Sequence, residues 1–314
     1  MIEMKPLSKE MKLNFKKQHY KIVGQHSACK LCYWTKESIK TGGKKHCYKE
    51  KFYSDIGIKS HRCLQCTPSL TFCTLRCKHC WRDISLTRGT KISIDEDDNI
   101  KFIIDGLFKA QKELLTGLGG VKHSEKYLKE AYTPKNIAIS LSGEPFCFEN
   151  LSELIKEFHK RDCITFLVTN GTFPEKIEKL ETLPTQLYVS LTSSNKEMMQ
   201  KLQSPLIPDA WERLNKTLDI LPEIKTRKVI RMTMIKNINT KNLEKFVPLI
   251  LKAKPNFIEV KSYIAIGSSR ERLGLDFMLS HKEIKEISEK ISKLTGYEIK
   301  DEQKESRVVL LKRQ

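Results

Sequence analysis

Short apolar runs alternate with amphipathic stretches along most of the chain after residue 67. Six runs are rich in β-branched and aromatic residues and are bounded by polar or turn residues. They predict strands at 69–72, 137–141, 164–168, 187–191, 229–235 and 257–263. Apolar residues at helical spacing predict helices between them, at 99–115, 151–159, 174–180, 209–221 and 240–253. This alternation predicts a parallel α/β sheet or an open barrel, with its chemistry at the carboxyl ends of the strands.

The two ends of the chain differ from this pattern. Residues 1–66 show little periodicity and are rich in Cys, Lys, His and aromatic residues, so we expect bound metal to stabilise them. A helix over 281–294 and a short strand over 308–311 are predicted at the other end. We therefore divide the chain into a Cys-rich, basic segment (1–66), a barrel (67–280) and a helix and strand that close the barrel (281–314).

Composition changes the interpretation of the cysteines. No run of about 18 apolar residues occurs and no secretory signal begins the chain, so we expect a cytoplasmic protein without a membrane segment. In a reducing compartment, closely spaced cysteines bind metal or do chemistry more often than they form disulfides. Eight of the ten cysteines lie between residues 29 and 80.

Charge is also unevenly distributed. The net charge is +19, and residues 1–90 hold 19 Lys or Arg against 6 Asp or Glu. A concentrated basic region attracts polyanions such as nucleic acids. A lysine-rich solvated surface explains the same composition equally well, so charge alone does not choose between them.

The densest cysteine motif is CxxxCxxC, formed by Cys73, Cys77 and Cys80 directly after the first predicted strand. Thiolates are the usual protein ligands of Fe–S clusters. Three of them can bind three irons of a 4Fe–4S cluster and leave the fourth iron open to a small molecule. A structural zinc ion that takes a fourth ligand such as His79 or Cys66 is the alternative.

This spacing resembles the signature of the radical S-adenosylmethionine (SAM) superfamily. Polar residues at the ends of the next strands support the resemblance. The tetrapeptide that begins at Ser142 looks like the motif that meets the methionine end of SAM, and its glycine permits close backbone approach. The resemblance implies that SAM is bound by Ser142, Gly143, Glu144, Pro145, Asn170, Ser190 and Thr192.

A second group of cysteines narrows the resemblance. The segments CYWTK, CYKEKFY and SHRC are similar to those of the radical SAM enzymes of wyosine biosynthesis, the tRNA 4-demethylwyosine synthases, over nearly the whole chain. The resemblance implies a partial (β/α)6 radical SAM barrel with an irregular Cys-rich N-terminal extension. It also implies a second 4Fe–4S cluster on Cys32, Cys47 and Cys63. Spacing alone favours zinc here, because Cys29 and Cys66 complete two CxxC pairs.

Lys49 lies two residues after Cys47, where the family carries the lysine that forms a Schiff base with pyruvate. An amine attacks a carbonyl only when it is unprotonated, so burial or nearby cations must lower its pKa. Without the resemblance, Lys49 is one of many solvated lysines.

The resemblance implies a carbon–carbon bond-forming lyase. Reductive cleavage of SAM yields a 5′-deoxyadenosyl radical, which removes hydrogen from the methyl group of N1-methylguanosine next to the anticodon of phenylalanine tRNA. The methyl radical attacks pyruvate held on Lys49, and a third ring closes to give 4-demethylwyosine. We expect a monomer of the stand-alone archaeal form, without the flavodoxin-like domain of eukaryotic relatives. Its electrons are then expected to come from a separate donor protein.

Two alternatives stay open. One is a radical SAM enzyme that acts on another RNA or on a protein. The other is a zinc-stabilised RNA-binding protein without catalysis.

Overall fold

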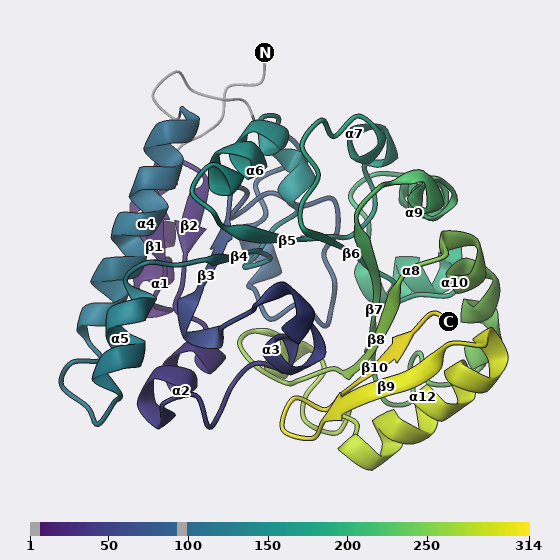
Figure 1. Ribbon diagram of the computed structural model, residues 1–314. Helices are drawn as coiled ribbons and strands as arrows, with labels where there is room; N and C mark the ends of the chain where they lie inside the picture. Colours follow the sequence, from purple (N-terminus) through teal and green to yellow (C-terminus); the bar gives the residue numbers. More distant parts are fainter. Residues whose placement is uncertain (1–6, 93–98) are drawn as a thin grey trace. The chain divides into compact units, whose positions relative to one another are not determined.

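Figure 1 shows the computed structural model, which describes residues 7–92 and 99–314. The described residues of Met1–Phe72, Arg88–Val168 and Glu181–Thr185 form a first unit. Those of Cys73–Thr87, Thr169–Leu180 and Gln186–Gln314 form a second. Within the described residues, no helix is both long enough and apolar enough to cross a membrane.

The sheet of the first unit changes from antiparallel to parallel pairing at one strand. In spatial order its strands are β1 (Lys21–Val23), β2 (Ser27–Cys29), β3 (Cys63–Thr67), β4 (Asn136–Ile139) and β5 (Ile164–Thr169). β3 pairs antiparallel with β2 and parallel with β4, and β4 pairs parallel with β5. The helices are α1 (Lys9–Lys17), α2 (Tyr33–Thr41), α3 (Tyr48–Phe52), α4 (Ile100–Thr116), α5 (Glu125–Ala131) and α6 (Leu151–His159).

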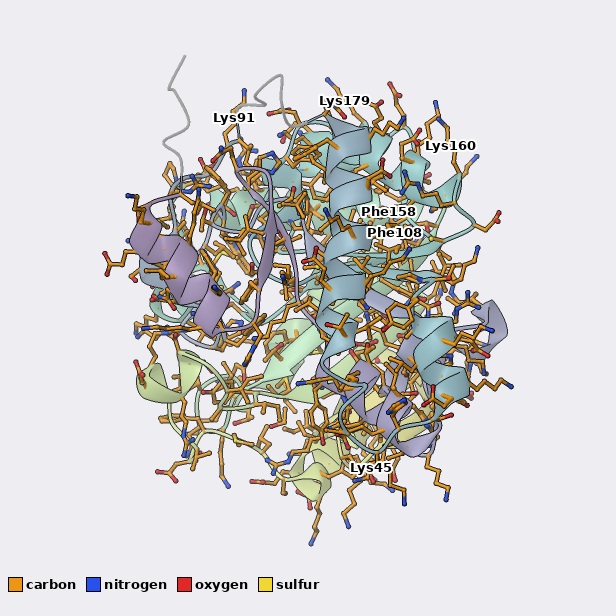
Figure 2. The ribbon with its side chains drawn as sticks, turned by 90° about the vertical axis from the view of Figure 1, so that its left-hand side faces the viewer. Lys45, Lys91, Phe108, Phe158, Lys160 and Lys179 are labelled. Atoms are coloured by element: carbon orange, nitrogen blue, oxygen red, sulfur yellow. The ribbon has the colours of Figure 1, made fainter. Side chains whose placement is uncertain are left out.

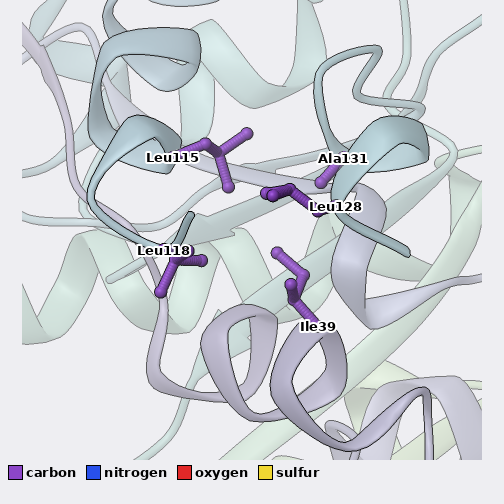
Figure 3. Packing of buried hydrophobic residues seen from close by; sticks show 5 residues of the cluster. All are labelled: Ile39, Leu115, Leu118, Leu128 and Ala131. Carbon is purple, nitrogen blue, oxygen red and sulfur yellow. The ribbon is translucent and has the colours of Figure 1, made fainter. Parts of the chain in front are cut away.

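Packing among helices fixes the region that carries the upstream cysteines. α4 begins where the side chain of Asn99 accepts a hydrogen bond from the Phe102 N–H at 2.8 Å. Figure 2 shows α4 lengthwise, with Phe108 beside Phe158 of α6 at 6.3 Å between ring centroids. A buried cluster joins α2 to α4, the turn after α4, and α5 through Ile39, Leu115, Leu118, Leu128 and Ala131 (Figure 3).

The second unit repeats the parallel arrangement and ends in an antiparallel pair. Its spatial order is β6 (Gln186–Ser190), β7 (Arg227–Met234), β8 (Phe257–Ser262), β10 (Val308–Lys312) and β9 (Glu298–Gln303). β6, β7 and β8 pair in parallel, whereas β10 pairs antiparallel with both β8 and β9. The helices are α7 (Pro174–Glu178), α8 (Lys196–Gln203), α9 (Ala210–Ile220), α10 (Val247–Ala253), α11 (Ser269–Arg272) and α12 (His281–Thr295).

Among the described residues six strands pair in parallel, three in each unit, and five of them fall where the sequence predicts them. The prediction at 69–72 is wrong, because the strand is β3, several residues earlier. Pro68 cannot donate to a sheet, and the Phe72 N–H closes a turn onto the Ser69 carbonyl at 3.0 Å. Cys73 therefore follows a turn rather than a strand.

The two ends of the chain also differ in detail from the expectation. The described part of the N-terminal segment, expected to be irregular, contains α1–α3 and strands that extend the sheet. At the other end, α12 and β10 match the predicted helix and strand, but β9 was not predicted. β9 has the sequence EIKDEQ and lacks a buried face, so it carries no alternating apolar signal. The domain boundaries at residues 66 and 280 stay predictions.

Candidate active site

The loop of residues 73–80 lies in the second unit and is fixed mainly through its backbone. The N–H groups of Arg76 and Lys78 donate to carbonyls of the last turn of α8, at 2.9 Å each. Arg272 donates to the carbonyls of Lys78 and Arg82 at 3.1 Å, and also to that of Cys80. These contacts shape the loop without using any cysteine side chain.

The structure brings the three thiols of this loop together. Burial raises the pKa of Cys77 well above its usual value, and the neighbouring Cys73 and Cys80 raise it further. A hydrogen bond from Gln203 acts in the opposite direction. Cys73 accepts from the Asn170 amide, with 3.7 Å between Nδ2 and Sγ.

Arg82 lies beside the same thiols and is buried, with 2% of its surface exposed. Burial lowers the pKa of the guanidinium, but the nearby Cys80, Cys73 and Cys77 raise it by more, so the net shift is upward. Its Nη2 donates to Thr87 Oγ1 at 3.1 Å, while Nε and Nη1 lack a hydrogen-bond partner among the described residues.

The second group of thiols lies in the first unit. Cys32 and Cys47 are the N-cap residues of α2 and α3, and neither side chain caps its helix. Cys63 begins β3. Burial raises the pKa of Cys63, and Cys32 and Cys47 raise it further, which places the three side chains near one another.

A network of hydrogen bonds holds the segments that carry these cysteines. The Cys47 N–H donates to the Ser60 hydroxyl at 2.9 Å, and the Ser60 N–H donates to the Glu50 carboxylate at 2.7 Å. The Thr35 hydroxyl, in the first turn of α2, donates to the Cys63 carbonyl at 3.4 Å. The three segments are therefore cross-linked by polar contacts that leave the thiols available.

Cys29 and Cys66 occupy a different environment. They face each other across the β2–β3 pair and are fully buried. Burial raises the pKa of Cys29 to about 12 and raises that of Cys66 as well. Free cysteines that are buried in this way behave as small apolar side chains.

A zinc ion and a 4Fe–4S cluster place different demands on their cysteine ligands. In residues 7–92 and 99–314, no group of three or more His, Cys, Asp or Glu side chains is arranged to hold one metal ion. A zinc ion needs its four ligands around one centre. In a 4Fe–4S cluster each cysteine binds a different iron, so the thiols need not converge on one point.

Lys49 lies beside the second group of thiols. Its ammonium group is 4.7 Å from the centre of the Phe166 ring, on β5. Its charge also lowers the pKa of Cys63, against the larger effect of burial. The structure therefore brings the predicted pyruvate-binding lysine and the three upstream cysteines into one neighbourhood.

The Ser142–Pro145 motif contacts the segment that precedes the Cys73 loop. Gly143 has φ +72°, and a Cβ added there would lie 1.8 Å from the Ser69 carbonyl oxygen. The Glu144 N–H donates to the Phe72 carbonyl at 2.8 Å, and its buried carboxylate accepts from the Phe146 N–H. The glycine thus permits a close backbone contact within the protein, and SAM binding by the motif stays a prediction.

The remaining predicted SAM-binding residues lie just after β5 and at or just beyond the end of β6. Asn170 donates to Thr74 Oγ1 at 2.9 Å as well as to Cys73. Ser190 ends β6, and Thr192 is buried just beyond it, with its carbonyl accepting from Asn239. Their contact with SAM stays a prediction.

Two neighbours of the cysteines were not singled out as site residues from the sequence, namely Gln203 and Arg82. Gln203 ends α8 and is far from the motif in sequence, so no local signal marks it. Arg82 lies two residues after Cys80. A positive charge next to three cysteines is a signal that could have marked it from the sequence.

Comparison with known proteins identifies the family. The sequence matches the profile of the Radical SAM superfamily over residues 67–250 and that of Wyosine base formation over residues 252–313. It is 47% identical over 304 residues to the S-adenosyl-L-methionine-dependent tRNA 4-demethylwyosine synthase of Pyrococcus abyssi, covering 95% of this chain and 87% of that protein. The enzyme of that name from Methanocaldococcus jannaschii is 40% identical over 301 residues, with 94% and 93% covered.

Two solved structures share the fold. A structure of TYW1 with a lysine-pyruvate adduct bound has a TM-score of 0.87 at 37% identity, covering 98% of this chain and 97% of that one. A crystal structure of archaeal TYW1 has a TM-score of 0.78 at 37% identity, covering 98% and 96%. The superfamily match confirms the radical SAM α/β fold and implies SAM and a 4Fe–4S cluster as cofactors. This chain therefore belongs to the radical SAM family of tRNA 4-demethylwyosine synthases.

Proposed function

We propose that this protein converts N1-methylguanosine, next to the anticodon of phenylalanine tRNA, and pyruvate into 4-demethylwyosine. The observation that carries the proposal is the position of Lys49 beside Cys32, Cys47 and Cys63. A relative that shares the fold was solved with a lysine-pyruvate adduct. The family resemblance, together with this position, supports Lys49 as the lysine for that role.

Cys73, Cys77 and Cys80 are the proposed ligands of the SAM-cleaving cluster. Their mutual proximity, and the hydrogen-bond donors beside them, support this assignment. When bound, the cluster supplies the electron that cleaves SAM to the 5′-deoxyadenosyl radical. The electron comes from a separate donor protein.

Cys32, Cys47 and Cys63 are the proposed ligands of a second 4Fe–4S cluster. The absence of a single-ion site among the described residues and the burial of Cys29 and Cys66 support a cluster over zinc. The two buried cysteines then serve as apolar packing between β2 and β3.

Lys49 is proposed to carry pyruvate. Its unprotonated Nζ attacks the ketone carbon, and loss of one water molecule leaves a carbon–nitrogen double bond, the imine. Neighbouring Phe166 excludes water from one side of the amine. The imine fixes the pyruvate carbons at one position, which is what a bond-forming reaction with a short-lived radical requires.

Trapping tests the role of Lys49. Borohydride reduction in the presence of pyruvate should fix a stable adduct, and peptide mapping should place it on Lys49. Lys49→Arg keeps the charge but forms no productive imine, so we expect loss of the tricyclic product with tRNA binding retained. Lys51→Arg, two residues away and exposed, is the matched control and should keep full activity. Product formation by Lys49→Arg at the normal rate would falsify the assignment.

Iron counting tests the second cluster separately. With Cys73, Cys77 and Cys80 all changed to Ala, we expect about four irons per chain to remain. Adding Cys47→Ala to this variant should remove them, whereas adding Cys29→Ala should not. Zinc in place of iron in the triple variant contradicts the proposal.

A further inference from the structure

Each cysteine of the Cys73 loop has its own donor side chain. Asn170 lies beside Cys73, Gln203 beside Cys77, and Arg82 beside Cys80. We call these three residues the donor set. Arg82 lies two residues after Cys80, whereas Asn170 and Gln203 come from other segments of the second unit and reach the sulfurs only through the tertiary structure.

We propose that the donor set stabilises the three thiolates and raises the reduction potential of the cluster that they bind. Its members are positioning residues, since they act through the cysteines. This inference rests on the proposed function, because it needs the SAM-cleaving cluster at these cysteines.

Asn170 is oriented by its own carbonyl oxygen. Oδ1 accepts from the Thr172 N–H at 3.0 Å and from the Thr172 hydroxyl at 2.7 Å. The amide nitrogen must then point the other way, where it lies 2.9 Å from Thr74 Oγ1 and 3.7 Å from Cys73 Sγ. Rotation of the amide would break both contacts of the oxygen.

Gln203 is oriented in the same manner. Ser193 Oγ donates to its Oε1 at 2.7 Å, which leaves the amide nitrogen to donate toward Cys77. Gln203 is 3% exposed and Ser193 is fully buried. Buried polar groups are normally hydrogen-bonded. An amide whose oxygen is fixed by one partner is therefore expected to donate its N–H groups to another.

Arg82 supplies a full positive charge. None of the described Asp or Glu residues forms an ion pair with this buried guanidinium, and two of its nitrogens lack a partner in that part of the chain. Burying an unpaired cation costs several kcal/mol. A cluster held by three thiolates is the anion that would compensate it.

The effect on the cluster follows from charge. Reduction adds one electron, so the reduced cluster is more negative than the oxidised one. Hydrogen bonds to the sulfurs and a nearby cation stabilise the more negative state more strongly, and this raises the potential. Removing a donor should therefore make the cluster harder to reduce.

The test measures the midpoint potential of the reconstituted enzyme without SAM, so that a role of Asn170 in SAM binding does not contribute. Asn170→Leu, Gln203→Leu and Arg82→Gln should retain iron but shift the potential to more negative values. For Arg82→Gln we expect the reduction equilibrium to fall roughly tenfold, which is about 59 mV for one electron.

Two comparisons control for packing. Gln186→Leu removes a fully buried amide of the same unit that bonds Tyr188 and Arg227 instead of a thiol, so the potential should not move. Arg82→Lys keeps the charge and should remain closer to the wild-type potential than Arg82→Gln does.

The outcomes separate this inference from the proposed function. Equal potentials for Arg82→Lys and Arg82→Gln, with unchanged potentials in the two amide variants, would overturn the inference while leaving the cluster in place. A wild-type protein that binds no SAM-cleaving cluster would overturn the proposed function itself.

Discussion

At the residue scale, the site depends on side chains whose partners lie far away in sequence. Gly143 is an example, because its role depends on having no side chain. Its φ of +72° and its approach to the Ser69 and Phe72 carbonyls exclude a Cβ atom. The contact holds the segment immediately before Cys73, so a motif expected to meet SAM also shapes the approach to the cysteine loop.

Gly143→Ala should therefore destabilise the protein. The new Cβ meets backbone oxygens at 1.8 and 2.6 Å, and the left-handed conformation adds strain. We expect a loss of about 2 kcal/mol or more in the free energy of unfolding, measured by urea denaturation. Gly57→Ala has a similar φ of +70° but no atom within 4 Å, so it should lose only the strain, about 1 kcal/mol. Equal losses for the two variants would show that the backbone contact is unimportant.

At the scale of elements, short helices and paired strands determine which partner each charged or polar side chain meets. Arg231, a cation within β7, is an example. The structure pairs it across β7 and β8 with Glu259, at 3.0 Å, and the Glu259 side chain is fully buried. Arg231 also lies over the Tyr188 ring, 4.6 Å from its centre. Its charge thus has a partner within the sheet.

Breaking this pair should be costly. Glu259→Gln leaves the largely buried Arg231 without its countercharge, and we expect a loss of about 3–5 kcal/mol in the free energy of unfolding, measured by urea denaturation. Glu212→Gln is the matched control, since its pair with Lys196 is about half exposed and should change stability far less. Combining Glu259→Leu with Arg231→Met should restore much of the loss. If Glu259→Gln costs no more than Glu212→Gln, the pair is not a stabilising element of the sheet.

At the scale of the whole molecule, the charge of +19 is the property most relevant to a tRNA substrate. Lysines such as Lys45, Lys91 and Lys160 project from the first unit into solvent (Figure 2). Phosphate contacts by such side chains release counterions, which makes binding dependent on salt. Lys44 and Lys45 are exposed and lie five and four residues before Lys49 in sequence, which makes them candidates for phosphate contacts.

We therefore expect tRNA affinity to fall steeply as salt rises. Changing both Lys44 and Lys45 to Gln should weaken binding and reduce the slope of log affinity against log salt by about one for each phosphate that is no longer neutralised. Lys290→Gln with Lys293→Gln removes two exposed lysines of α12 and should leave the slope unchanged. A slope that is flat in the wild type, or equal in both pairs of variants, argues against phosphate-led binding by the N-terminal third.

The sequence by itself determined the elements with strong periodicity and the candidate ligands with strict spacing. Buried parallel strands such as β4 and β5, and amphipathic helices such as α4 and α6, are predictable because one face or both faces must be apolar. The motif of Cys73, Cys77 and Cys80 is local, so spacing suffices to find it. The family resemblance pointed to Lys49, which chemistry alone would not have chosen among so many lysines.

Only the tertiary structure decided what lies around those residues. β3 replaced the strand expected at 69–72 because long-range pairing with β2 and β4 outweighs the local apolar run. Cys29 and Cys66 do not join Cys32 and Cys63 in one group. The pairing of β2 with β3 places Cys29 opposite Cys66 and buries both. Asn170 and Gln203 meet the thiols from distant parts of the second unit, and Arg82 joins them from two residues after the motif. Periodicity reports which face of an element is buried, whereas contacts between elements depend on how the elements pack, and no local pattern encodes that.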